Sequence, residues 1–371
     1  MRILIDYQIL VDQKYGGVSK YTYNLYSRLL KRNNIKINIP ILFSRNYYFK
    51  DTIKPLKNYQ ILDVKIIRWT VKIINAINTV MYYLVSKIDI YHPSFYGIYL
   101  FPFIGKKAKV VVTIHDMIHE IYKDDIYSAK RTIFRKKVMI EKADVIIAVS
   151  GNTKKDIMRF YPEIEDNKIK VIYEGGLIDR KIRNVKNIPD KYVLYVGNRE
   201  GYKNFSTLIK AMDYIFYETN DIYLVCVGGG KLTENELNVL SDDTFRKNVI
   251  QVNCDDAELN YLYQKACCYV NPSKYEGFGI PIIEAFENSC PVILANASCF
   301  PEIGGNACLY FEADSVIELS KLIISIIENG NLREKMIKKG LERSKLFSWD
   351  KMENEVFKLY TELLEEGCDN K

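Results

Sequence analysis

The stretch Asn271–Asn296, NPSKYEGFGIPIIEAFENSCPVILAN, decides the fold of this chain. The apolar run Cys267–Val270 leads into it and predicts a strand, which ends at a loop with two glycines. Pro281 then suits the first turn of a short helix, and the apolar run Pro291–Ala295 predicts the next strand. A strand, loop, helix and strand in this order form the repeating unit of a parallel sheet covered by helices.

Two glutamates flank the loop, Glu276 within it and Glu284 one turn into the helix. The residues at the junction of loop and helix are Gly277, Phe278, Gly279 and Ile280. Because glycine leaves the backbone uncovered, N–H groups here can bind an anion, and the helix N-terminus adds about half a positive charge. A carboxylate can accept two hydrogen bonds from a vicinal diol, so Glu284 suits a ribose and Glu276 a hexose. Each glutamate taken alone also fits an ordinary surface position.

The whole stretch resembles the E-x7-E donor-sugar signature of glycosyltransferase family 4. This resemblance implies an α/β protein of the GT-B fold, in which two Rossmann-like, doubly wound parallel-sheet domains face a central cleft, and it implies a retaining enzyme. It runs over most of residues 1–355, densely from 110 to 310 and thinly from 35 to 85. Family members contact the acceptor in the thin region, so the sequence leaves the acceptor open, as it does the donor sugar and its base.

The chain has room for two domains. Its 371 residues exceed one typical domain, and 48% apolar with 27% charged residues is typical of a soluble globular protein. The polar segment 179–190, DRKIRNVKNIPD, predicts a linker. We expect an N-terminal acceptor-side domain at 1–184 and a C-terminal nucleotide-sugar-binding domain at 185–349. The resemblance implies that a last helix, 350–371, packs back on the first domain.

The net charge of +7 is unevenly distributed. Residues 1–190 hold 34 Lys and Arg against 18 Asp and Glu, a formal charge of +16, so the remainder carries −9. An anionic membrane surface or a phosphate-bearing acceptor would suit the basic half, and a merely solvated basic face is the alternative. We expect no nucleic-acid partner, because no RNP, zinc-finger or helix-turn-helix signature is present.

Two segments bear on where the chain works. The N-terminus does not resemble a secretory signal, because Asp6 interrupts its apolar run. The segment Arg68–Val85 is rich in Ile, Val and aromatic residues and has basic residues at its start. It could lie in a membrane interface, although we favour a core helix.

All eight cysteines lie beyond residue 225 without a C-x-x-C pair, which favours reduced thiols. We expect a cytoplasmic protein, with peripheral attachment to the inner face of the membrane as an option.

Further candidate residues follow the predicted strands of the N-terminal half. Gly16 and Gly17 stand between a first strand, Arg2–Leu10, and a helix. His92 and His115 come just after two apolar strands, where an open parallel sheet binds its ligands. The motif around His115, TIHDMIHE, resembles the family motif whose histidine contacts the donor sugar, and the two glycines resemble the loop near the donor diphosphate. We therefore favour His115 over His92, as a hydrogen-bonding group and not as a general base.

Arg199 and Lys203 project from a predicted strand-to-helix loop, GNREGYKNF, with Asn204 as a candidate N-cap. Two cations beside a helix N-terminus suit a departing nucleoside diphosphate, although solvated surface positions are the default for such residues. The resemblance favours Lys203. Arg199 is less secure, because Asn198 stands where the family pattern has arginine.

No D-x-D pair occurs in the sequence, and no strand-end turn carries G-x-G-x-x-G. We therefore expect metal-independent transfer with no cofactor beyond a UDP- or GDP-linked sugar. The leading hypothesis is a hexosyltransferase of the mannose or glucose type that acts on a glycan or lipid-linked acceptor in cell-surface polysaccharide synthesis. The alternatives are a sugar-nucleotide epimerase or phosphorylase on the same fold, and a non-enzymatic basic module that binds membranes or nucleic acid.

Overall fold

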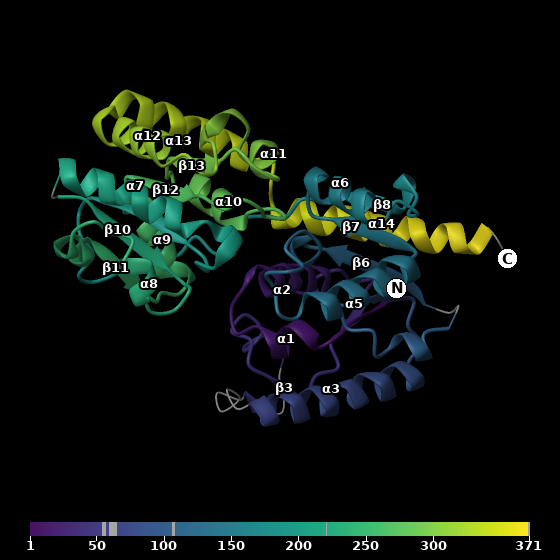
Figure 1. Ribbon diagram of the computed structural model, residues 1–371. Helices are drawn as coiled ribbons and strands as arrows, with labels where there is room; N and C mark the ends of the chain where they lie inside the picture. The colour runs from purple at the N-terminus through teal and green to yellow at the C-terminus, as the bar shows by residue number, and fades with distance from the viewer. Residues whose placement is uncertain (54–56, 59–64, 106–107, 220, 370–371) are drawn as a thin grey trace. The chain divides into compact units, whose positions relative to one another are not determined.

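The computed structural model describes residues 1–53, 57–58, 65–105, 108–219 and 221–369. The chain divides into two compact units, which are coloured by residue number in Figure 1. Unit 1 comprises Met1–Glu174 and Trp349–Lys371, and unit 2 comprises Gly175–Ser348. Each unit is built around its own six-stranded sheet. The predicted α/β fold with two parallel sheets is confirmed.

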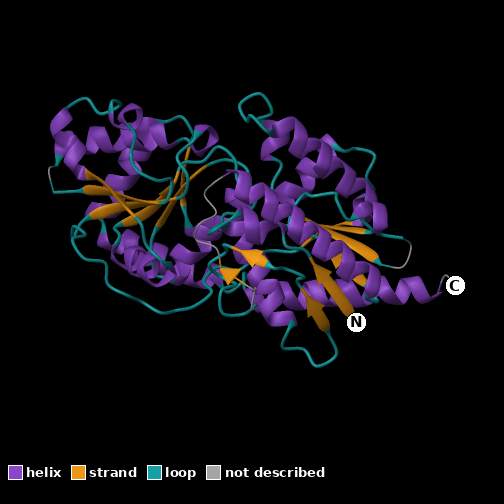
Figure 2. Cartoon of the chain, turned by 90° about the horizontal axis from the view of Figure 1, so that it is seen from below, coloured by secondary structure: helices purple, strands orange, loops and turns teal. Residues whose placement is uncertain are grey.

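The sheet of unit 1 is parallel throughout, with the strand order β2-β1-β5-β6-β7-β8. Its strands are β1 (Arg2–Ile5), β2 (Lys36–Asn38), β5 (Ile90–His92), β6 (Lys109–Ile114), β7 (Val145–Ala148) and β8 (Ile169–Val171). The central strands are apolar without alternation, as in VIIA of β7, because helices cover both faces. Figure 2 shows the strands between layers of helix.

Several helices and a small strand pair complete unit 1. The helices are α1 (Gln8–Asp12), α2 (Gly17–Leu29), α3 (Lys65–Val85), α4 (Ile118–Ile121), α5 (Ala129–Lys142), α6 (Gly151–Phe160) and α14 (Trp349–Asp369), with short 3-10 turns η1 (Phe101–Phe103) and η2 (Asp166–Lys168). The strand pair is β3 (Phe43–Ser44) with β4 (Lys57–Asn58). No helix in the described ranges is long and apolar enough to cross a membrane. The expected core helix, α3, buries one side only, and several of its apolar side chains are exposed.

Unit 2 repeats this architecture, with the strand order β11-β10-β9-β12-β13-β14. The strands are β9 (Tyr192–Val196), β10 (Tyr223–Val227), β11 (Val249–Val252), β12 (Cys268–Asn271), β13 (Val292–Ala295) and β14 (Leu309–Phe311). The helices are α7 (Phe205–Glu218), α8 (Glu234–Leu237), α9 (Asp256–Lys265), α10 (Ile280–Glu287), α11 (Phe300–Gly304), α12 (Val316–Glu328) and α13 (Gly330–Ser344), with 3-10 turns η3 (Gly201–Lys203), η4 (Asp243–Asn248) and η5 (Gly305–Ala307). The stretch 267–296 thus forms β12, α10 and β13, the strand, helix and strand that its sequence predicts.

The first strand is shorter than its apolar run suggests. We predicted a strand over Arg2–Leu10, but β1 ends at Ile5 and α1 begins at Gln8. The cause is Asp6, which is fully buried and accepts hydrogen bonds from the backbone N–H groups of Gln8 (3.3 Å) and Ser94 (3.1 Å). These bonds turn the chain, and the next apolar residues form a buried helical turn. A short apolar run does not by itself distinguish strand from helix.

The boundary between the units falls earlier than the sequence suggests. We placed residues 175–184 in the first domain, but they belong to unit 2. The reason is a set of hydrogen bonds to that unit's helices. The N–H of Leu177 donates to the carboxylate of Glu287 (2.7 Å), and the side chain of Asn260 donates to two carbonyls of this segment (3.0 and 2.9 Å). These residues therefore form an ordered edge of unit 2 and not a loose linker.

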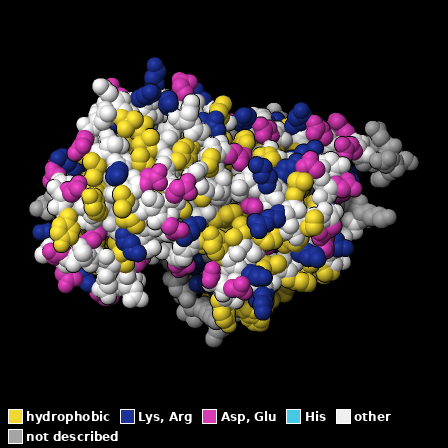
Figure 3. Space-filling model, turned by 45° about the horizontal axis from the view of Figure 1, so that its top comes forward, with side chains coloured by type: hydrophobic (Ala, Val, Ile, Leu, Met, Phe, Trp, Pro, Cys, Tyr) yellow, Lys and Arg dark blue, Asp and Glu magenta, His cyan; other side chains and the backbone are white. Residues whose placement is uncertain are grey.

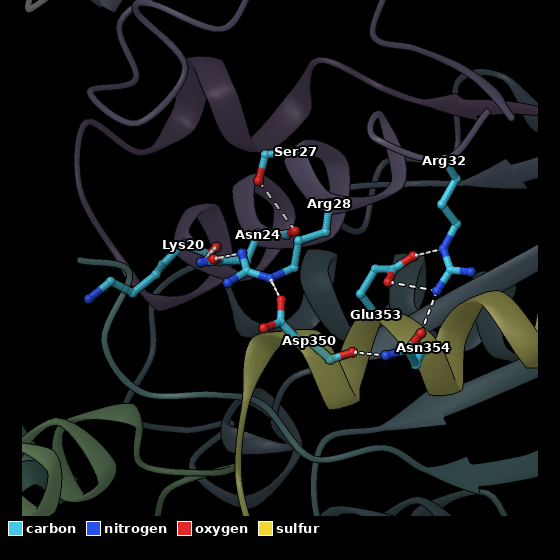
Figure 4. Close-up of polar contacts among 8 residues, drawn as sticks. All are labelled: Lys20, Asn24, Ser27, Arg28, Arg32, Asp350, Glu353 and Asn354. Atoms are coloured by element: carbon cyan, nitrogen blue, oxygen red, sulfur yellow. Dashed lines mark hydrogen bonds and ion pairs between the residues drawn. The ribbon is translucent and has the colours of Figure 1, made fainter. Parts of the chain in front are cut away.

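The last helix, α14, packs on α2 within unit 1. Figure 4 shows the polar part of this contact. The guanidinium of Arg32 donates to both carboxylate oxygens of Glu353 (2.6 and 2.9 Å), and Arg28 donates to Asp350 (2.7 Å). Glu353 is buried, and the bond to its carboxylate raises the pKa of Arg32. This two-point ion pair joins segments more than 300 residues apart in the sequence.

Replacing Glu353 by alanine should destabilise unit 1 by about 2 kcal/mol, because it leaves a half-buried guanidinium without its partner. The measurement is urea unfolding followed by tryptophan fluorescence, since both tryptophans of the chain, Trp69 and Trp349, lie in unit 1. The matched control on the same helix is Glu362→Ala, which breaks the exposed pair with Lys358 and should cost less than about 0.5 kcal/mol. Equal losses in the two variants would contradict this account.

Candidate active site

The loop between β12 and α10 carries the acidic part of the site in unit 2. Gly279 directly precedes α10 and has φ +90°, a conformation that glycine adopts without strain, and an added Cβ would lie 2.8 Å from Ile282. Pro281 stands in the first turn, as the sequence predicts. Phe278 and Ile280 are buried, and the ring of Phe278 packs edge-on against Phe347. The loop is therefore held by apolar side chains, with its backbone close to the start of the helix.

Glu276 and Lys203 meet in this loop. The ammonium of Lys203, at the end of η3, donates to Oε1 of Glu276 (2.6 Å), and the hydroxyl of Ser273 donates to the same oxygen (3.1 Å). Both charged side chains are largely but not fully buried. The hydroxyl of Ser298 donates to the Glu276 carbonyl (2.6 Å) and accepts from its N–H (3.3 Å). The structure thus brings together two residues that the sequence singled out separately.

Glu284 occupies a more enclosed position on α10. It is buried and accepts a hydrogen bond from the hydroxyl of Tyr263 (3.3 Å), a residue of α9. Tyr269, on β12, lies close enough to both glutamates to be affected by their charges. Burial raises the pKa of Tyr269 well above its usual value, and Glu276 and Glu284 raise it further. Both carboxylates therefore lie near Tyr269 in unit 2.

Arg199 is engaged differently from Lys203. Its guanidinium donates to the carboxylate of Glu236 (2.6 Å) and to four consecutive carbonyls of the turn after β10. These are the carbonyls of Gly228, Gly229, Gly230 and Lys231. The side chain is only 3% exposed. Asn204 likewise bonds the carbonyl of Ala313 and the hydroxyl of Thr207 instead of capping α7 through its side chain. In this structure Arg199 fixes the glycine turn instead of presenting its charge to solvent.

In unit 1 His115 follows β6 directly and has a defined set of neighbours. Its Nδ1 lies 3.2 Å from Oε1 of Glu174, its backbone N–H donates to the hydroxyl of Tyr96 (3.2 Å), and the ring of Tyr21 packs edge-on against it. Glu174 is buried, so its negative charge orients the imidazole with Nδ1–H toward the carboxylate. Nε2 of His115 is then left as the ring atom that can accept a hydrogen bond.

His92 is the last residue of β5 and belongs to a buried network. Its Nδ1 lies 2.5 Å from the hydroxyl of Tyr360 on α14, and its Nε2 lies 2.8 Å from Oγ1 of Thr113. Thr113 in turn bonds the hydroxyl of Tyr21 (3.0 Å). His92 and His115 both line a small cavity beside α2. Burial lowers the pKa of His92 to about 3, and the neighbouring His115 adds to this effect, so His92 is neutral at physiological pH.

Gly16 and Gly17 lie at the start of α2, close to the side chain of Gln13. A Cβ on Gly16 would lie 2.5 Å from Oε1 of Gln13, and this same oxygen accepts the N–H of Ser19 (3.1 Å). The side chain of Gln13 therefore accepts a hydrogen bond from a backbone N–H in the first turn of α2. Gly17 is exposed and begins α2.

Sequence reasoning did not find Glu174, Tyr21 or Ser298, although each contacts a predicted residue. Glu174 is 59 residues from His115 in the sequence, and Ser298 is 22 residues from Glu276. One signal was available for Glu174, because it comes three residues after β8, at the same sheet edge as His115. Ser298 has φ +53°, which the sequence does not announce.

Two family models match the chain. The model described as Glycosyltransferase Family 4 matches residues 15–176, and the model described as Glycosyl transferases group 1 matches residues 178–343. The chain is 30% identical over 288 residues to O-antigen chain mannosyltransferase B of Escherichia coli, a match that covers 73% of this chain and 74% of that protein.

Two solved structures share the fold over nearly the whole chain. Sucrose-phosphate synthase from Thermosynechococcus elongatus has a TM-score of 0.77 at 19% identity, covering 98% of this chain and 99% of the other. HepE from Anabaena, solved in complex with UDP-glucose, has a TM-score of 0.68 at 15% identity, covering 98% and 100%. At these identities the likeness shows the fold alone.

The two parallel sheets, each with polar groups at its strand ends, define the GT-B class of glycosyltransferases. The chain belongs to glycosyltransferase family 4, among the group 1 enzymes that resemble O-antigen mannosyltransferases. It is therefore a transferase, and the non-enzymatic alternative is wrong. The roles of the individual site residues stay predictions.

The neutral state of His92 predicts a pH dependence of stability. Its pKa is about 3 in the folded chain and about 6.5 when unfolded, so between these values only the unfolded state binds the proton. The free energy of unfolding of unit 1 should therefore fall as the pH drops below about 6.5, by up to about 1.4 kcal/mol per pH unit.

Urea unfolding at pH 7.5 and 5.5, monitored by tryptophan fluorescence, measures this decrease in the free energy of unfolding. His92→Gln keeps an amide that can bond Thr113 but does not titrate, so its loss over the same interval should be smaller by about 1.4 kcal/mol. His119, whose pKa burial also lowers, is present in both proteins and cancels in the comparison. The same pH slope in both proteins would show that His92 is not the source.

Proposed function

We propose that this enzyme transfers a hexose of the mannose or glucose type from a UDP- or GDP-sugar to a glycan or lipid-linked acceptor in cell-surface polysaccharide synthesis. The observation that carries the proposal is the Lys203–Glu276 pair beside the backbone of Gly277–Gly279. A cation, a carboxylate and a helix N-terminus at one loop are the groups that a sugar diphosphate needs. The named activity of the E. coli relative supports a mannose-type donor, and the UDP-glucose complex of HepE supports a nucleotide-sugar.

Lys203 is the group we assign to the leaving diphosphate. Negative charge builds up on the departing phosphate oxygens, and a positioned ammonium stabilises that charge more in the transition state than in the ground state. In the structure this ammonium donates to Glu276 at 2.6 Å. A diphosphate would draw it away from Glu276, and the freed carboxylate could then accept hydrogen bonds from the sugar hydroxyls. Donor binding and the freeing of Glu276 would thus be coupled.

Glu284 and His115 are assigned to binding and orientation. Glu284 is suited to the ribose diol, because it is held on α10 and has a hydrogen-bond partner in Tyr263. His115 is oriented by Glu174, so its Nε2 can accept a hydrogen bond from a hydroxyl of the sugar. Neither residue acts as a general acid or base in this proposal. Both would hold the donor in one geometry, which lowers the entropic part of the barrier.

We further propose retention of configuration without a protein nucleophile. The acceptor oxygen would bond to the anomeric carbon on the face from which the diphosphate leaves, and its proton would pass to the departing phosphate oxygen. Lys203 would supply the positive charge that a metal supplies in other transferases, so transfer would be metal-independent. We place the enzyme in the cytoplasm, with peripheral attachment to the inner face of the membrane.

A panel of nucleotide-sugars tests the proposal directly. UDP- or GDP-linked glucose or mannose should raise the melting temperature and undergo slow hydrolysis, because a ligand that binds only the folded state stabilises it. The same panel is repeated in EDTA, and hydrolysis should be unchanged. No stabilisation by any sugar nucleotide would overturn the proposed donor class. Activity lost in EDTA and restored by Mn²⁺ would overturn metal independence alone.

Two variants should separate chemistry from binding. Lys203→Ala should lower kcat about 10²–10³-fold, because it removes a charge that acts on the leaving group. Glu284→Ala should weaken donor binding by about tenfold or more with a smaller effect on kcat, because it removes a ground-state hydrogen-bond acceptor. Calorimetry gives the donor Kd, and single-turnover hydrolysis gives the rate. Lys210→Ala, an exposed lysine on α7, is the matched control and should change neither value. An unchanged donor Kd in Glu284→Ala would remove Glu284 from the site.

A further inference from the structure

The buried side of α3 carries two polar residues, Asn75 and Thr79, between the apolar Val71 and Tyr83. Asn75 and Thr79 are both fully buried. The side chain of Asn75 accepts from the N–H groups of Leu42 (2.8 Å) and Phe43 (3.3 Å) and donates to the carbonyl of Phe43 (2.9 Å). The hydroxyl of Thr79 lies 2.8 Å from the carbonyl of Asn75 in the same helix and 3.2 Å from the carbonyl of Pro40. Hydrogen bonds therefore hold α3 to the chain beneath it.

The outward side of α3 is apolar. We call the outer stripe the residues Trp69, Ile73, Ile77, Met81 and Leu84, all of which are exposed. Trp69 is 67% exposed and Ile77 is 59% exposed. At about 100° per residue these five positions fall within an arc of about 120° along one side of the helix. An exposed stripe of large apolar side chains over about four helical turns is a surface that some partner covers.

The charges on α3 indicate what that partner is. The helix contains Lys65, Arg68 and Lys72 in its first eight residues and no acidic residue at all, and no charged residue occurs from 73 to 85. Lys72 pairs with Asp12 of α1, so Lys65 and Arg68 supply the remaining positive charge of the helix. Residues 1–190, which supply most of unit 1, carry a formal charge of +16. A second copy of this chain would bring the same basic residues to the contact. An anionic lipid surface complements both the apolar stripe and the positive charge.

The position of α3 also fits a flat partner. Figure 1 shows α3 running along the outside of unit 1, on the far side of α1, against which it packs. It is too polar to cross a bilayer. On the face seen in Figure 3, Lys and Arg side chains alternate with Asp and Glu and form no continuous basic area. Charge alone therefore gives that face no strong attraction to lipid, and the apolar stripe is the distinguishing feature.

We propose that α3 lies in the plane of an anionic membrane, with the outer stripe inserted at the boundary between headgroups and acyl chains. The proposal corrects our preference for a core helix over Arg68–Val85. This proposal deepens the proposed function. It rests on that function in one respect, that a lipid-linked acceptor is located at the membrane. A helix bound in this way would bring the enzyme to such an acceptor without a membrane-spanning segment.

Tryptophan fluorescence tests the proposal, because the chain has a natural reporter in the outer stripe. Of its two tryptophans, Trp69 is 67% exposed whereas Trp349 is 2% exposed. Vesicles of phosphatidylcholine with phosphatidylglycerol should shift the emission to shorter wavelength, and brominated acyl chains should quench it. Trp69→Phe should abolish both effects while keeping vesicle binding within about twofold, since phenylalanine stays apolar.

Co-sedimentation with the same vesicles measures the contribution of the stripe. Ile77→Asn/Leu84→Asn should lower the partition coefficient roughly tenfold or more, because two inserted side chains are lost. Ile317→Asn is the matched control, since Ile317 is 63% exposed on α12, and it should bind like the unmodified chain. Donor hydrolysis without vesicles should be the same in all variants, so a failure of membrane binding is distinct from a failure of the proposed activity.

Three outcomes would overturn the proposal. Binding that salt abolishes, with no change in Trp69 emission, would mean simple electrostatic adsorption without insertion. A blue shift that grows with protein concentration in the absence of vesicles would mean that a second copy covers the stripe. No binding and no spectral change would mean that the outer stripe does not meet lipid.

Discussion

The carboxylate and backbone of Glu276 hold three strand ends of unit 2 in one arrangement. The side chain of Glu276 bonds Lys203 after β9, and its backbone bonds Ser298 after β13. Glu276 itself follows β12, which lies between β9 and β13 in the sheet. Parallel strands bring their carboxyl ends to one edge, and this residue cross-links three neighbours there. The ion pair therefore both shapes the loop and keeps an ammonium at the place where the proposed donor would need it.

Unit 1 uses the same edge of its sheet differently. Its strand ends carry His92, His115 and Glu174, and only the last two form a pair that can bear charge. His92 is kept neutral by burial and is used up in bonds to Thr113 and Tyr360. A neutral, hydrogen-bonded surround suits the hydroxyls of a sugar more than a phosphate. The two units thus offer different chemistry, a cation in unit 2 and an oriented imidazole in unit 1.

The sequence predicted the sheets well because their strands are buried on both faces. Short apolar runs such as VIIA in β7 and VILA in β13 are typical of buried parallel strands when glycine or proline lies near an end, as it does here. The sequence also singled out Lys203 and Glu276, because both lie in strand-end loops, and the structure pairs them while their roles stay predictions. Arg199 was harder, since its partners are the carbonyls of a turn about 30 residues away. Residue types and spacing do not reveal which of two neighbouring cations is already engaged inside the fold.

The orientation of α3 shows a second limit of sequence reasoning, and its cause is the backbone beneath the helix. Its composition fits a core helix, because apolar content alone does not say which side faces inward. The backbone groups of Leu42 and Phe43 lie outside the six-stranded sheet and need partners, which the amide of Asn75 supplies. Once Asn75 and Thr79 face inward to meet that need, helical geometry directs Trp69, Ile77 and Leu84 outward. The apolar exterior of α3 therefore follows from the hydrogen bonds that Asn75 makes on its inner side.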